Sequence, residues 1–137
     1  MGIKTRKISV RDLAIGGGAP ISVQSMCATR TRDIDATLRQ IDLLQKAGAD
    51  LIRIAVDNLL DVQALVEIRK STSARLVVDL QENFRLADKV APHVDKLRYN
   101  PGHLHHIERE KPIDEKVVWL TAVAQEYGCA IRIGVNC

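Results

Sequence analysis

Three apolar segments of this sequence each carry one arginine in their interior, with a small or polar residue two or four positions later. These are residues 51–57, 96–102 and 130–136. In a β-strand, positions i, i+2 and i+4 share a face, so Arg98 and Asn100 point the same way, as do Arg132 and Asn136. A guanidinium inside a buried strand is costly unless an anion or an acceptor meets it. Together with Arg53, the repetition favours a site for one shared anionic ligand.

The alternative is that each arginine pairs with a carboxylate of the chain itself. The candidate partners are Asp57, Asp79 and Asp95. In that case the arginines are structural, and the chain is a non-catalytic, self-associating module rather than a ligand-binding protein.

Length and composition indicate one soluble globular domain. The chain has 137 residues, of which 46% are apolar and 27% charged, and this length suffices for a hydrophobic core. The net charge is +3 and basic residues alternate with acidic ones, while only one Trp, two Tyr and one Phe are present. Neither a nucleic-acid partner nor a membrane partner is expected from this pattern.

The cysteines and histidines do not form a recognisable metal motif. Cys27, Cys129 and Cys137 are far apart and lack CxxC spacing, which predicts reduced thiols. A loop with three histidines has no carboxylate or cysteine at ligand spacing, so an exposed loop is favoured over a metal site; these are His103, His105 and His106. No run approaches the ~20 apolar residues of a membrane span, and no signal core follows the N-terminus. A cytoplasmic protein is expected.

The order of predicted elements is typical of an α/β fold. A β-hairpin over residues 3–15 precedes alternating strands and helices, and each strand is almost entirely apolar, as in a parallel sheet covered by helices. The expected strands are 21–26, 51–56, 75–80, 95–99 and 130–135, and the expected helices are 34–47, 59–70, 83–90 and 113–127.

Two parallel architectures fit this order, an open doubly wound sheet and a (β/α)8 barrel. The glycine fingerprint of a dinucleotide-binding fold is missing after the first strand. Polar residues gather at the C-terminal ends of several strands, where barrel enzymes build their sites; they are Asp57, Asp79, Asn100 and Asn136. We therefore predict a partial TIM-type barrel, with about five of its eight strands.

Several motifs together resemble one enzyme family. Residues 19–26, 31–33, 50–56, 95–102 and 131–136 occur in the order and at about the spacing seen in 4-hydroxy-3-methylbut-2-enyl diphosphate synthase, an iron–sulfur oxidoreductase of the non-mevalonate pathway of isoprenoid biosynthesis. The resemblance covers nearly the whole chain, but only the N-terminal barrel portion of the family's protein.

The resemblance implies a barrel whose C-terminal mouth binds 2-C-methyl-D-erythritol 2,4-cyclodiphosphate. Arg53, Arg98, Asn100, Arg132 and Asn136 match the family's substrate-binding positions, and guanidinium groups suit this ligand because they can donate to two phosphate oxygens at once. In the family, a separate C-terminal domain holds a [4Fe-4S] cluster, and ferredoxin or flavodoxin supplies electrons. No cofactor is expected in this chain.

The chain departs from the family after the third strand. Asp79 and Gln81 are further substrate-binding candidates, but Gln81 stands where the family usually has a histidine, so a titratable ring is lost. Because the iron–sulfur domain is absent, the chain alone is expected to be catalytically incomplete and to self-associate through strand 130–135. A phosphate-binding barrel of another pathway, of the pterin-binding synthase type, is a second alternative.

Overall fold

The computed structural model describes residues 3–135, and it begins with a β-hairpin. Strands β1 (Ile8–Val10) and β2 (Leu13–Ile15) pair antiparallel. The tight turn between them places Arg11 in the left-handed region, at φ 54°. The predicted N-terminal hairpin is confirmed.

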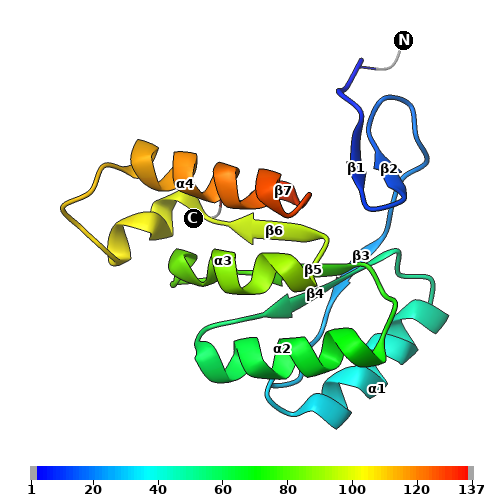
Figure 1. The fold of residues 1–137 in the computed structure, drawn as a ribbon. Helices are drawn as coiled ribbons and strands as arrows, with labels where there is room; N and C mark the ends of the chain where they lie inside the picture. Colours follow the sequence, from blue (N-terminus) through cyan, green and yellow to red (C-terminus); the bar gives the residue numbers. More distant parts are fainter. Residues whose placement is uncertain (1–2, 136–137) are drawn as a thin grey trace.

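Five parallel strands form the main sheet, in the order in which they occur in the chain (Figure 1). This arrangement, in which every strand pairs with the next along the chain, is that of successive β/α units of a barrel. The strands are β3 (Gln24–Met26), β4 (Leu51–Ala55), β5 (Leu76–Asp79), β6 (Lys96–Tyr99) and β7 (Ala130–Ile133). The predicted α/β fold is therefore confirmed.

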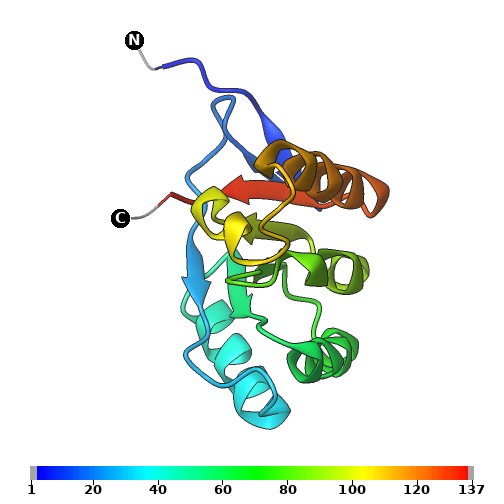
Figure 2. The ribbon, with the colours of Figure 1, turned by 90° about the vertical axis from the view of Figure 1, so that its left-hand side faces the viewer.

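The helices follow the strands and lie along one side of the sheet (Figure 2). Asp33 accepts from the Ala36 N–H at the start of α1, and Asn58 accepts from two N–H groups at the start of α2, so both helices have the side-chain caps that fix their first turns. The helices are α1 (Ile34–Lys46), α2 (Leu59–Ser71), α3 (Ala87–Val90) and α4 (Ile113–Glu126).

Two predicted elements differ in extent. The first strand begins at Gln24 rather than at residue 21, and the side chains of Ile21 and Val23 are exposed. The helix expected at 83–90 is instead a 3-10 turn (Phe84–Leu86), the short α3, and a second 3-10 turn (Ala91–His93). Pro92 explains the irregular end, because proline lacks the N–H that a continuing α-helix requires.

The sheet buries its two faces differently. The helix-facing side contributes Ile52, Leu76 and Leu97 to a large apolar core. On the opposite, inner face a smaller core joins Val10 of the hairpin to Leu51 and Val77. The hairpin thus packs against the N-terminal half of the inner face, and the C-terminal half is left to polar side chains.

A bidentate ion pair between Arg75 and Asp12 helps to hold the hairpin against the sheet. Arg75 Nε and Nη2 donate to the two carboxylate oxygens of Asp12, at 2.7 and 2.9 Å. The side-chain hydrogen bond from Arg75 holds the pKa of Asp12 well below its ordinary value.

Within residues 3–135, no helix combines the length and the apolar character needed to cross a membrane.

Candidate anion-binding site

Strand register brings four cationic side chains to the inner face of the sheet. Arg98 lies opposite Asp79 on β5 and Arg132 on β7, while Arg53 and Lys96 both lie opposite Val77. Residues opposite one another in register share a face. Among the residues of the five strands on this face, Asp79 is the one carboxylate, so the face carries three positive charges in excess.

Arg98 and Asp79 form the central ion pair of this face. Arg98 Nη1 lies 3.1 Å from Asp79 Oδ1, and the two side chains are 14% and 7% exposed. The low exposure means that water screens the pair weakly. Sequence reasoning predicted both residues as site members, and the structure brings them together.

Arg53 shares the same carboxylate at longer range. Its Nε lies 3.9 Å from Asp79 Oδ2, and its Nε and Nη2 lie 3.2 and 3.1 Å from the thioether sulfur of Met26. A thioether is a weak acceptor, so these contacts leave most of the donor capacity of Arg53 available to a ligand.

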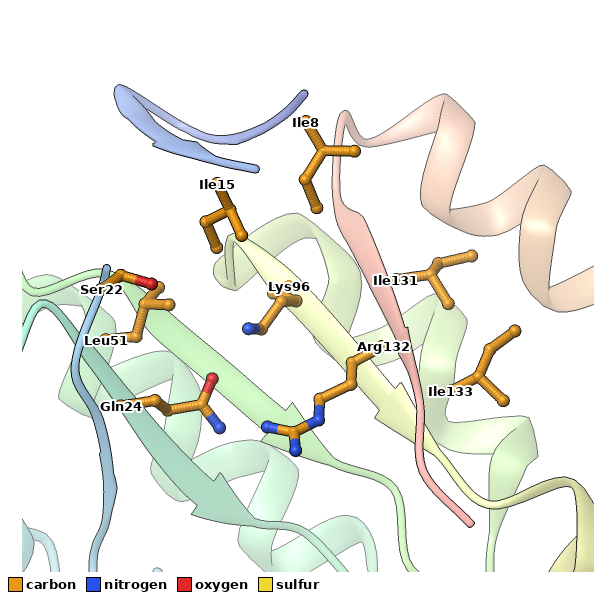
Figure 3. A pocket seen from close by; sticks show the side chains of 9 residues that line it. All are labelled: Ile8, Ile15, Ser22, Gln24, Leu51, Lys96, Ile131, Arg132 and Ile133. Atoms are coloured by element: carbon orange, nitrogen blue, oxygen red, sulfur yellow. The ribbon is translucent and has the colours of Figure 1, made fainter. Parts of the chain in front are cut away.

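Arg132 extends from the edge strand β7 into an open pocket of about 430 Å³, which Lys96 and Gln24 also line (Figure 3). Sequence reasoning had named Arg132 but assigned no role to Lys96 or Gln24. The signal for Lys96 was present, because it lies two residues before Arg98 in the same strand and therefore shares its face.

Asn100 lies just past β6 and fixes the following turn. Its Oδ1 accepts from the Gly102 N–H at 2.9 Å, and the residue is buried. This bond orients the Asn100 side chain at the carboxyl end of β6; its part in substrate binding stays a prediction. The other predicted asparagine, Asn136, lies outside the described residues.

Asp57 and Gln81 meet at the carboxyl ends of β4 and β5. With the amide oriented so that its nitrogen donates, Gln81 hydrogen-bonds the Asp57 carboxylate. The Gln81 backbone lies in the unusual left-handed region, at φ 42°. Burial and the nearby carboxylates of Asp61, Asp79 and Glu82 raise the pKa of Asp57. Asp57 is thus a carboxyl group in this region that holds a proton more readily than an ordinary aspartate.

The histidine loop folds back onto Glu82. The 3-10 segment Pro101–His106 places His106 Nδ1 in hydrogen-bond contact with Glu82 and His103 Nδ1 3.4 Å from it. The contact with His106 lowers the pKa of Glu82. Lys116 of α4 stabilises this loop, because its buried ammonium donates to the carbonyls of Leu104 and Ile107, at 2.5 and 2.6 Å.

The described cysteines do not fit an iron–sulfur cluster. Cys27 follows β3 at the C-terminal end of the sheet, whereas Cys129 precedes β7 at the N-terminal end and donates to the carbonyls of Ala91 and Val94. Burial raises the pKa of both thiols to about 11, which disfavours the thiolate that a metal requires. Across residues 3–135, no group of three His, Cys, Asp or Glu side chains is placed to hold a metal ion.

The fold and the site together define a class. Five consecutive β/α strands, with polar and charged side chains gathered at their carboxyl ends, are typical of a barrel of the TIM type. A family model described as "GcpE TIM-barrel domain" matches residues 5–137. The chain belongs to this GcpE family, which confirms the predicted TIM-type architecture and sets aside the pterin-binding alternative.

Three similar proteins carry the name 4-hydroxy-3-methylbut-2-en-1-yl diphosphate synthase (flavodoxin). The chain is 59% identical over 97% of its length to the protein of Rhodopirellula baltica, 47% identical over 96% to that of Nitratiruptor sp., and 44% identical over 98% to that of Wolinella succinogenes. The shares of these relatives that are covered are 35%, 36% and 35%, so the chain spans about a third of their length.

Proposed function

We propose that this chain is the N-terminal barrel portion of a 4-hydroxy-3-methylbut-2-enyl diphosphate synthase and binds the cyclic diphosphate substrate of that enzyme. The observation that carries the proposal is the inner face of the sheet, where four cations meet one carboxylate. The pairing of Arg98 and Arg53 with Asp79 is the contact that a purely structural role would use, but it neutralises only one of the four charges.

The charge of the proposed ligand suits this face. A cyclic diphosphate keeps one ionised oxygen on each phosphorus and so carries two negative charges. Arg98, Arg53 and Arg132 present planar donor groups to it, which favours bidentate contacts with phosphate oxygens. Asn100 supplies a buried amide beside them, and Asp57 a carboxyl of raised pKa at the same edge. In this proposal the residues of the chain bind and orient the anion.

The reductive step is proposed for a whole protein of the relatives' length. The iron–sulfur cluster finds no fitting donor set among residues 3–135, so it is assigned outside them. The name of the relatives contains flavodoxin, and we infer a small redox protein, flavodoxin or ferredoxin, as the electron donor in a cytoplasmic setting. The chain alone is expected to bind substrate without reducing it.

Isothermal titration of the chain with 2-C-methyl-D-erythritol 2,4-cyclodiphosphate tests the binding proposal. Arg98→Ala is expected to weaken binding by about 1–3 kcal/mol, the range for losing a charged hydrogen bond. Arg39→Ala is the matched control, because Arg39 is an exposed arginine of α1; its affinity should equal that of the wild type.

If Arg98→Ala and Arg39→Ala lost affinity equally, the loss would be explained by the change in net charge alone. That result would contradict a specific site. A chain that is folded by circular dichroism and does not bind would also contradict the proposal for this chain. The same pair of variants in a protein of the relatives' full length would then tell whether the arginines serve binding once the remaining strands are present.

A further inference from the structure

The pocket beside β7 lies deeper in the inner face than the carboxyl ends of the strands. It has a volume of about 430 Å³ and opens between the hairpin, the edge strand β7 and the start of β3 (Figure 3). The hairpin closes it on one side with Ile8 and Ile15, and Lys96, Gln24 and Arg132 all point into it. It is therefore an apolar-walled hollow with three polar groups converging inside.

Two of these polar groups have no partner among residues 3–135. Lys96 is 6% exposed, yet its ammonium makes no hydrogen bond and no ion pair with any described side chain. The Oε1 atom of Gln24 is also buried without a hydrogen-bond partner. Buried polar groups in folded proteins are almost always satisfied, so the unpartnered Gln24 Oε1 and the Lys96 ammonium facing the same hollow point to a ligand there.

The charges around Lys96 specify the sign of that ligand. Burial, followed by repulsion from Arg132 and Arg53, lowers the pKa of Lys96 to about 8, which leaves the amine mostly charged at neutral pH. Asp79 cannot relieve this repulsion, since it already pairs with Arg98 and Arg53. An anion between Lys96 and Arg132 would offset both the desolvation cost of the buried Lys96 charge and its repulsion from Arg132.

We propose that Lys96, Arg132 and Gln24 form a second oxyanion site, which binds a phosphate ion in the hollow below the carboxyl ends of the strands. Lys96 and Arg132 supply the charge. Gln24 supplies an amide N–H to one phosphate oxygen, and its carbonyl oxygen accepts from the P–OH group that phosphate retains at neutral pH. This deep phosphate position shares Arg132 with the proposed diphosphate site at Arg98, Arg53 and Asn100, and its argument does not depend on the identity of the substrate.

Titration of the chain with inorganic phosphate at constant ionic strength tests this site. Lys96→Gln is expected to raise the dissociation constant at least tenfold. Lys89→Gln, which changes an exposed lysine of α3, is the matched control and should bind phosphate like the wild type. Binding that is the same in Lys96→Gln as in the wild type would overturn the proposal, as would the lack of saturable binding by a folded wild-type chain.

Gln24→Glu provides an independent variant that keeps the size of the side chain. It places a carboxylate opposite Lys96, so the melting temperature should rise while phosphate binding is lost. Unchanged phosphate affinity in this variant would contradict the proposed role of Gln24. Arg98→Ala separates the two sites: phosphate binding that survives there but not in Lys96→Gln supports the deep position. The reverse pattern would place the ion at the strand ends and overturn the proposal.

Discussion

Gly134 lies directly against the guanidinium group of Arg98. A Cβ atom added at Gly134 would come within 2.5 Å of Arg98 Nη2 and 2.7 Å of Cζ. The Gly134 N–H meanwhile donates to the Tyr99 carbonyl at 2.9 Å, which fixes the backbone just beyond β7 beside β6. The absence of a side chain at 134 is thus what allows Arg98 to reach Asp79 in its observed position.

Gly134→Ala is therefore expected to move Arg98 without unfolding the chain. Gly134 does not have a left-handed φ, so alanine meets no backbone strain, and the guanidinium is the flexible end of its side chain. The free energy of unfolding should change by less than about 1 kcal/mol. Affinity for the cyclic diphosphate should fall by about tenfold, or 1.4 kcal/mol. Urea unfolding and isothermal titration measure the two quantities.

A double-mutant cycle checks that the effect passes through Arg98. In an Arg98→Met background, Gly134→Ala should cause no further loss of affinity, because the group that it displaces is already gone. Additive losses would show that Gly134 acts through another contact.

The sequence was sufficient to predict the element order, because most strands lie in short segments rich in apolar residues and the three long helices, α1, α2 and α4, have a cap or a glycine stop. The segment at 21–23, with Ile21 and Val23 on either side of a serine, was a weaker guide. Ile21 was predicted to lie in the first strand because it is hydrophobic, but its side chain is 96% exposed and the strand begins only at Gln24. Pro92 marked the end of a helix correctly, but it could not predict that only Ala87–Val90 would be α-helical.

For the candidate site, the sequence predicted which residues of one strand share a face, but it did not predict which side chains of neighbouring strands are in contact. Alternation along one strand led to the prediction that Arg98 and Asn100 share a face, and the same rule places Lys96 with Arg98, although Lys96 was assigned no role. The contacts of Asp79 with Arg98 and Arg53, and of Gln81 with Asp57, depend on which residues of neighbouring strands lie opposite one another. That register is set by packing of the whole sheet, and a single sequence does not contain it in readable form.

Lys116→Met is expected to destabilise the histidine loop and the fold. The Lys116 ammonium is 1% exposed and bonds two loop carbonyls, and methionine would leave both without this donor. The loss should be about 2–3 kcal/mol in the free energy of unfolding. Lys111→Met is the control: its exposed pair with Glu108 should contribute less than about 1 kcal/mol. Similar losses in urea unfolding of the two variants would contradict the special role of Lys116.

The sheet has two edge strands, β3 and β7, and this chain is predicted to self-associate through β7. Ile133 and Val135 are 60% and 84% exposed at this edge, and an apolar strand edge favours pairing with another copy. Light scattering should find dimers or larger species, and Ile133→Lys should shift them towards monomer. A wild-type chain that is monomeric across the concentration range would contradict this prediction.

Lys96 is expected to make the chain more stable as pH rises above about 8. The pKa of Lys96 falls from an ordinary 10.5 to about 8 in the folded chain, so between these values the unfolded chain binds more protons and the free energy of unfolding increases with pH. Below pH 8 the cost of the buried charge is fully present, up to about 3 kcal/mol.

Comparison with Lys96→Met isolates this contribution, because the variant has no amine at this position. The charged groups that act on Lys96 are Arg53 on β4 and Arg132 on β7, and arginines do not titrate in this range; Gln24 and the hairpin side chains Ile8 and Ile15 are uncharged. The variant should therefore be the more stable chain at pH 7, and its advantage should shrink as pH approaches 10. Urea unfolding at several pH values measures this, and parallel profiles for the two chains would show that Lys96 is not the titrating group.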